Sequence, residues 1–168
     1  MQDGAFGRRF RLELIARRAA MSTAELRIAY ERDEDGTGKI IATARAGAFA
    51  GRGEAWLGRD LDDFVKDLRS YPLSRDKPPM IEGGYFDGQG ALAQCFVRIV
   101  VKPYDFRGHL LVHTDLATLV QSTPDADVQN SASIRFLTEY AILERFAVEF
   151  GELLKGQRQV AILTGTTS

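Results

Sequence analysis

The run from Ala91 to Lys102 constrains the fold more than any other part of the chain. Its odd-numbered positions are all apolar, whereas its even-numbered positions mix apolar and charged side chains. This period of two, rich in β-branched residues, predicts a strand with one dry face and one partly solvated face. Such a strand would be about 40 Å long, against about 20 Å for a typical one. A strand of that length must twist or bend, so we expect it to anchor a curved antiparallel sheet.

The size of the chain predicts a single domain over residues 1–168, with loose ends at 1–7 and 164–168. A chain of this size buries about 68–70% of the surface that its unfolded form exposes, so a full hydrophobic core needs no disulfide. The single cysteine, Cys95, excludes an intrachain disulfide and favours a reducing compartment. Its position in the apolar alternation predicts a core residue rather than a reactive thiol.

Charge and hydropathy exclude several classes of function. The net charge of −1 disfavours a nucleic-acid-binding protein, and no apolar run reaches the length of a membrane helix. Residues 12–16 do not read as a signal peptide, because Glu13 interrupts them and arginines flank them. We therefore expect a cytoplasmic protein of bacterial type, with no cofactor. Gly36-Thr-Gly-Lys39 is interpreted as a hairpin turn rather than a phosphate loop, since a strand follows it.

Further alternating stretches predict more strands, over 25–30, 39–46, 80–86, 109–116 and 130–140. Residues 8–18 fit either a strand or an amphipathic helix. Residues 160–163 fit either an edge strand or a disordered tail. Gly47, Gly51 and Gly53 predict a bulge or bend between Phe49 and Trp56.

Two stretches follow the helical period instead. Residues 60–71 carry an apolar stripe of Leu61, Phe64, Val65 and Leu68, and Pro72 stops the pattern. Residues 141–155 carry a second stripe of Leu143, Phe146, Ala147, Phe150 and Leu154, with Gly156 after it. Two helices cannot cover both faces of such a sheet. The expected fold is therefore α+β, a curved and mainly antiparallel sheet of about seven strands whose concave side wraps one or both helices.

The run His109-Leu-Leu-Val-His113-Thr-Asp115 places two histidines and an aspartate on one face of a strand. A shared metal ion is disfavoured, because strand positions four apart lie about 13 Å from each other. His113 and Asp115 are close enough to form a hydrogen bond. The chain lacks a Gly-x-Ser-x-Gly elbow, and we assign neither catalytic residues nor metal ligands.

Four segments in order carry a resemblance to known proteins. They are Glu54-Ala-Trp56, the helix through Leu61 and Leu68, the turn and strand Gly108-His-Leu-Leu-Val-His113, and the run from Phe136 to Leu154. This pattern resembles small bacterial proteins of uncharacterised families that sit beside polymorphic toxins and are regarded as immunity-like. The resemblance implies a compact α+β protein that binds through its surface. Trp56 is expected to pack beneath the helix that follows it.

Three hypotheses follow. The leading one is a non-enzymatic bacterial domain that binds another protein, such as a cognate toxin. The alternative is a small-ligand-binding protein or enzyme that uses the concave sheet face, lined by Arg98, His113, Asp115 and Tyr140. A concavity filled by the phenylalanines of the second helix would end that alternative. The third hypothesis is a homodimer formed through an exposed strand edge.

Overall fold

The computed structural model describes residues 23–35, 37–57, 60–120 and 128–167, and these residues form an α+β fold. The strands are β1 Thr23–Arg32, β2 Gly38–Ala46, β3 Phe49–Leu57, β4 Met80–Phe86, β5 Leu92–Pro103, β6 His109–Ala117, β7 Ser131–Glu139 and β8 Ala161–Thr166. The helices are α2 Asp60–Leu68 and α3 Tyr140–Leu154. The predicted fold class is confirmed, with eight strands in place of about seven. The strand or helix expected over 8–18 lies outside the described residues, as does the loose end at 1–7.

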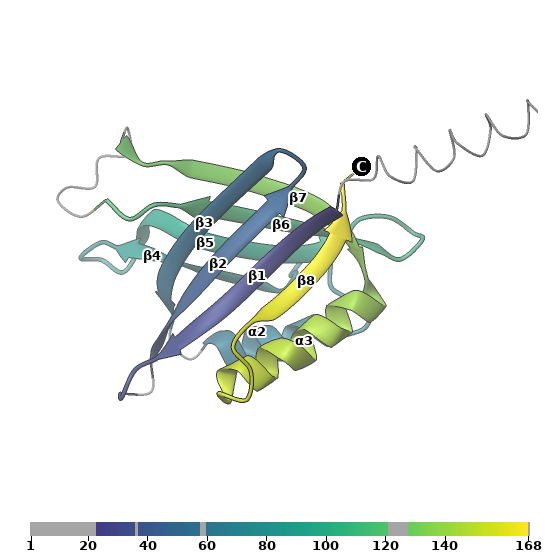
Figure 1. Ribbon diagram of the computed structural model, residues 1–168, viewed down its shortest axis with the longest axis horizontal. Helices are drawn as coiled ribbons and strands as arrows, with labels where there is room; N and C mark the ends of the chain where they lie inside the picture. Colours follow the sequence, from purple (N-terminus) through teal and green to yellow (C-terminus); the bar gives the residue numbers. More distant parts are fainter. Residues whose placement is uncertain (1–22, 36, 58–59, 121–127, 168) are drawn as a thin grey trace, which may run out of the picture.

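All eight strands belong to one antiparallel sheet in the order β3-β2-β1-β8-β7-β6-β5-β4. The two end strands, β3 and β4, are not hydrogen-bonded to each other, so the sheet does not close into a barrel. It curls until β3 packs face to face against β4, β5, β6 and β7 (Figure 1). We call β1, β2, β3 and β8 the front layer, and β4 to β7 the back layer.

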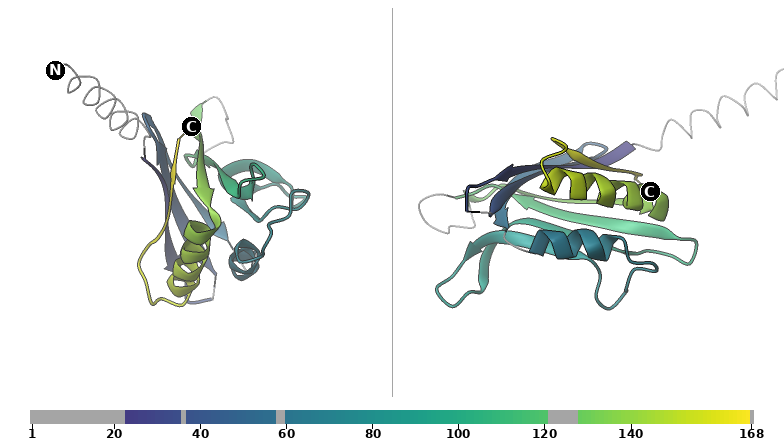
Figure 2. Two further views of the ribbon diagram at one scale, coloured as in Figure 1. Left: turned by 90° about the vertical axis from the view of Figure 1, so that its right-hand side faces the viewer. Right: turned by 90° about the horizontal axis from the view of Figure 1, so that it is seen from below.

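The two layers diverge from a narrow junction. β8 pairs with β1 from Thr23↔Thr166 to Ile28↔Ala161, but it pairs with β7 only at Leu137↔Thr166. Beyond that position the layers separate, and α3 fills the wedge between them (Figure 2). α2 packs against α3 and β4 on the side of the back layer. The expected concave sheet with helices inside it is therefore confirmed.

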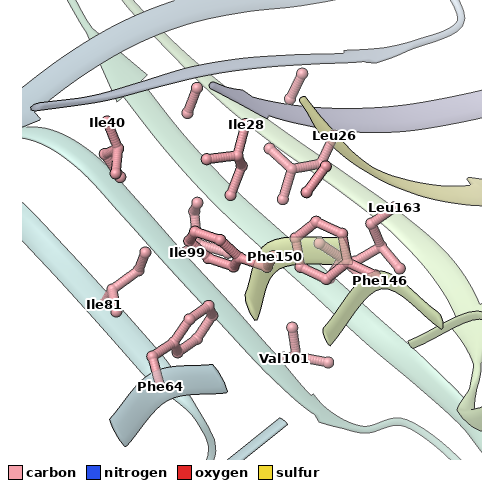
Figure 3. Packing of buried hydrophobic residues seen from close by; sticks show 14 of the residues in the cluster. Leu26, Ile28, Ile40, Phe64, Ile81, Ile99, Val101, Phe146, Phe150 and Leu163 are labelled. Carbon is pink, nitrogen blue, oxygen red and sulfur yellow. The ribbon is translucent and has the colours of Figure 1, made fainter. Parts of the chain in front are cut away.

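One continuous core fills the space between the layers and the helices. Side chains from β1, β2 and β8 point toward those from β4 and β5, and Phe64 of α2 and Phe146 and Phe150 of α3 lie between them (Figure 3). The ring centroids of Phe64 and Phe150 are 6.0 Å apart, and those of Phe146 and Phe150 are 5.7 Å apart. Edge contacts of this kind add to the stabilisation that burial alone provides.

The helices follow the predicted stripes closely. All five predicted core positions of α3 are buried, as are Leu61, Phe64 and Leu68 of α2. α2 ends at Leu68 rather than at residue 71, because the residue before a proline avoids the helical conformation and Tyr71 precedes Pro72. Of the helices in the described part of the chain, none has the length and apolarity needed to cross a membrane.

The glycine-rich stretch after β2 is a full strand, not the predicted bulge or bend. β3 pairs with β2 without a register shift from Gly38↔Leu57 to Ala46↔Phe49. A Cβ at Gly51 would lie 2.7 Å from the Cβ of Ala132, and one at Gly53 would lie 2.3 Å from the carbonyl oxygen of Phe96. These glycines are therefore required by the close approach of the two layers rather than by a change in backbone direction.

The prediction that Cys95 lies on the apolar face of β5 is wrong. Gly83 pairs with Val97 and Gly84 pairs with Cys95, so Phe96 is an extra residue in the strand. A bulge of this kind reverses the alternation, and Phe96 and Val97 are both buried as a result. Cys95 therefore lies half-buried on the outer face, near Arg98 and Asp115, rather than in the core.

The structure also differs from the prediction at the end of the chain. Residues 160–163 were expected to form an edge strand or a tail, and 164–168 a loose end. Instead β8 is an interior strand between β1 and β7, and Ala161 and Leu163 are fully buried. The prediction failed because pairing with β1, which lies far away in sequence, decides the position of this short segment.

Candidate functional site

Polar side chains cross the outer face of the back layer in one row. Glu82, Arg98, Asp115 and Ser133 lie opposite one another on β4, β5, β6 and β7. The next row contains Met80, Val100, His113 and Arg135. We call Glu82, Arg98, His113, Asp115, Ser133 and Arg135 the outer cluster. Three of the four predicted ligand-binding residues therefore meet, but on the face opposite the concave one.

Hydrogen bonds connect the members of the outer cluster. Arg98 Nε donates to Glu82 Oε2 at 2.9 Å, and Ser133 Oγ donates to Asp115 Oδ1 at 2.7 Å. His113 Nε2 lies 3.0 Å from Asp115 Oδ1, so the predicted contact between these two residues is confirmed. The same nitrogen lies 3.1 Å from Arg135 Nη2.

These contacts do not form the geometry of a nucleophilic triad. In such a triad the imidazole lies between the acid and the hydroxyl, with one nitrogen facing each. Here His113 Nε2 faces both Asp115, at 3.0 Å, and Ser133 Oγ, at 3.3 Å. The Ser133 hydroxyl donates its hydrogen bond to the Asp115 carboxylate at 2.7 Å instead of to the imidazole. The arrangement therefore holds the hydroxyl and the acid together without activating a nucleophile.

Charges in the outer cluster control two pKa values. Burial would raise the pKa of Asp115, but the hydrogen bond from Ser133 and the nearby His113 and Arg98 lower it below its ordinary value of 3.8. Burial raises the pKa of the Cys95 thiol, and Glu82 and Asp115 add to this effect while Arg98 opposes it. A thiol that stays protonated is a poor nucleophile, so the Cys95 environment does not favour thiolate chemistry.

The fourth predicted residue, Tyr140, lies elsewhere. It begins α3, and its hydroxyl accepts a hydrogen bond from the backbone N–H of Leu73 at 3.2 Å. His109, on the same strand as His113, is 2.6 Å from Asp105 through its Nδ1. The described residues contain no group of three side chains that could hold a metal ion.

The concave face offers no room for a ligand at the position that was expected. Phe146 and Phe150 of α3 fill it, and both are fully buried. A hollow of about 480 Å³ lies beside β1 and β8, near Ile142, and one of about 220 Å³ lies beside Cys95 and Ser133. Both are open to solvent.

Aromatic side chains lie on three segments: the one that follows α2, the turn between β5 and β6, and the start of α3. The rings of Tyr71 and Tyr140 are 4.8 Å apart, and the guanidinium of Arg75 lies 5.5 Å from the ring centre of Phe106. Tyr104 donates its backbone N–H to the carbonyl of His109, which lies opposite Glu139, the neighbour of Tyr140. Tyr71 is 81% exposed and Phe106 is fully exposed. We call Tyr71, Arg75, Tyr104, Phe106 and Tyr140 the aromatic end.

Sequence reasoning missed the aromatic end, because its residues come from three separate segments of irregular pattern. It also predicted the wrong environment for Trp56, which is 58% exposed on β3 instead of packed beneath α2. The sequence does indicate that Arg98 and Asp115 lie opposite each other, since the short turn between β5 and β6 sets the register of this hairpin.

Comparisons with protein-family models, curated proteins and solved structures found no match.

Proposed function

We propose that this chain is a non-enzymatic domain that binds another protein through its aromatic end. The observation that carries the proposal is the exposure of Tyr71 and Phe106, at 81% and 101%, in a protein whose core is otherwise complete. Large exposed aromatic side chains cost solubility, so a group of them on one surface favours an interaction site.

The composition of the aromatic end supports a protein partner in particular. Tyrosine, phenylalanine and arginine are enriched at protein–protein interfaces, and tyrosine and arginine are frequent among the residues that dominate binding energy. Arg75 lies 5.5 Å from the ring centre of Phe106, so the two side chains together offer a partner a cation and an aromatic ring.

Two further observations favour a binding protein over an enzyme. The concave face is filled by Phe146 and Phe150, which removes the support for a ligand site there. The outer cluster lacks the connectivity of a catalytic triad and lies on an open sheet face. A toxin is the partner that the resemblance to immunity-like families implies, and the proposal includes it as the specific case.

The test is quantitative capture of partners from extract of the source cell. Tyr71→Ala/Phe106→Ala is compared with the wild type and with Val148→Ala, a control that removes another exposed apolar side chain, eight residues along α3 from Tyr140. A partner held by the wild type and the control should bind the double variant about 30-fold more weakly or worse, because the loss of one such residue alone costs about 2 kcal/mol.

Equal thermal unfolding of the three proteins would show that each variant is folded. Absence of any specific partner at micromolar concentration would overturn the proposed function. A partner that binds the double variant as tightly as the wild type would overturn the assignment of the aromatic end.

A further inference from the structure

The two edges of the sheet are protected very differently. Edge strands carry unpaired backbone N–H and C=O groups, and proteins usually shield them with bulges, prolines, lysines or a covering element. The β4 edge has three of these features. Its pairing with β5 shifts register twice, Pro78 and Pro79 precede it, and α2 packs against it.

The β3 edge lacks such protection. β3 is nine residues long, keeps an unbroken register with β2 and contains neither proline nor lysine. Within the part of the chain that the structure describes, its backbone makes no hydrogen bond outside the ladder with β2.

Beside this edge, the back layer extends past the front layer. Close contacts of Gly51 with Ala132, of Gly53 with Phe96 and of Ala55 with Gly83 mark the line along which β3 crosses the back layer. Beyond that line, the ends of β4, β5 and β7 project past β3 (Figure 1). Large exposed apolar side chains lie at this projecting end, which we call the shelf: Tyr85 and Phe86 on β4, Leu119 after β6 and Val128 before β7.

From these observations we propose that the free edge of β3 accepts an extended segment of a partner protein. The segment adds a strand beside β3, hydrogen-bonds to its backbone and lies over the shelf. β-strand addition of this kind obtains affinity from main-chain hydrogen bonds and specificity from alternate side chains.

The same geometry defines the chemistry of the segment. Its side chains on the inner face are apolar, because they meet the shelf. Its outward side chains lie beside Arg52 and Glu54, which are solvent-facing neighbours on β3. Glu54 already pairs with Lys39 at 3.1 Å, whereas Arg52 has only Glu54 at 3.8 Å. Opposite charges in directly facing positions stabilise a strand pair, so an antiparallel segment carries an acidic residue opposite Arg52.

A second copy of this chain does not fit the edge equally well. Antiparallel pairing of β3 with itself requires a two-fold axis perpendicular to the sheet. The shelf of each copy would then project behind the β3 strand of the other, into space that its own back layer occupies (Figure 1). An isolated strand has no such layer behind it.

This site is separate from the aromatic end. The shelf lies at the Leu92 end of β5, whereas the aromatic end lies beyond Pro103, at the opposite end of the same strand. The inference therefore goes beyond the proposed function and does not depend on which partner the aromatic end binds.

The test uses a synthetic peptide that copies Gly38–Ala46 with Thr43→Glu. Gly38–Ala46 already pairs with β3 through the other edge, and the change puts an acidic residue opposite Arg52. The peptide's Ile40, Ala42 and Ala44 are apolar on one face, as the shelf requires. The peptide is titrated to about 1 mM into the isotopically labelled full chain. Backbone amide signals of Phe49–Leu57 and of the shelf should shift, whereas those of β4 before the shelf should not.

Amide exchange provides a sharper signature. Only alternate residues of an antiparallel strand donate toward a given side, so every second amide of β3 should gain protection while the others stay unchanged. A peptide with Ile41→Pro and Thr43→Pro, which cannot form the ladder, should cause neither effect. Phe86→Ala/Leu119→Ala should weaken binding of the peptide without proline about tenfold, and Tyr71→Ala/Phe106→Ala should leave the binding of that peptide unchanged.

Unshifted β3 amides at the highest peptide concentration would overturn the inference, as would equal shifts with the proline peptide. Self-association through β3 without peptide, seen by sedimentation and abolished by the shelf variant, would show that the occupant is a second copy. Since the aromatic-end variant is the control here, loss of peptide binding leaves the proposed function standing.

Discussion

At the scale of single residues, the glycines of β3 have the largest structural consequence. Gly51 and Gly53 face the back layer, where a methyl group would lie within 3 Å of another atom. The neighbour of Gly51 is the Cβ of Ala132, a side chain that can be removed, whereas the neighbour of Gly53 is the backbone of Phe96. The distance between the layers is therefore set by the lack of side chains at these positions.

The first prediction concerns a compensating pair. Gly51→Ala should lower the free energy of unfolding by about 1–3 kcal/mol, because the new Cβ overlaps that of Ala132 at 2.7 Å. Adding Ala132→Gly should restore part of the loss, although a glycine in a strand itself costs about 0.5–1 kcal/mol. Urea unfolding of the two single variants and the double variant measures the coupling.

The control for this pair is Gly88→Ala. Gly88 has open space around it, so its substitution should leave stability nearly unchanged. Strictly additive effects of Gly51→Ala and Ala132→Gly would contradict the close approach of the two layers.

At the scale of elements, the outer cluster consists of two bonded groups on neighbouring strands. Arg98 of β5 pairs with Glu82 of β4, while His113 and Asp115 of β6 bond to side chains of β7; Arg98 acts on Asp115 as a nearby charge. These pairs are partly exposed, and exposed ion pairs contribute little to stability. Their effect is therefore seen best in the ionisation of Asp115.

The second prediction follows from the sign of that shift. The pKa of Asp115 is lower in the folded protein than its ordinary value of 3.8, so the charged carboxylate stabilises the fold above about pH 3.8. This contribution is lost as the pH falls from 3.8 through the folded pKa. Asp115→Asn should therefore be less stable than the wild type near pH 6, with a difference that shrinks below pH 3.8.

An NMR titration of the Asp115 carboxyl carbon measures the shift directly. Ser133→Ala is the matched variant, because the Ser133 hydroxyl is the leading group that lowers this pKa. The midpoint should lie below 3.8 in the wild type and move upward in Ser133→Ala. A wild-type midpoint at or above 3.8 would contradict the network.

At the scale of the whole molecule, β8 joins the two layers. It pairs with β1 along its length and touches β7 at Thr166, and it contacts α3. Ala161 and Leu163 are fully buried in the common core. Because both layers and both helices share that core, the described residues should unfold as one cooperative unit.

The third prediction is that removal of residues 161–168 abolishes the folded state. Without β8, β1 loses one of its two hydrogen-bonded neighbours and the core is opened beside Leu26 and Phe146. Leu163→Ala is a graded comparison, which should keep a cooperative transition and lose about 2–5 kcal/mol. Thermal unfolding by circular dichroism and the dispersion of amide signals check both. A truncated chain that melts like the wild type would mean that β8 is dispensable.

Much of the fold could be predicted from local patterns. The stripe from Leu143 to Leu154 identified α3 and its buried face, and alternation identified β1, β2 and β4 to β7. β3 was missed, because glycines usually indicate a bend, whereas here they allow close contact between the two layers. Within the candidate site, the contact of His113 with Asp115 was predicted from spacing, but Tyr140 was assigned to a cluster that it does not join.

The sequence by itself determined most of the helices and strands and most of their apolar faces, since both properties repeat over neighbouring residues. The tertiary structure decided the rest. It turned Cys95 to the outer face through the bulge at Phe96, placed β8 inside the sheet, and left the β3 edge open beside the shelf. These outcomes depend on how segments far apart in the chain pack together, which periodicity along the chain does not encode.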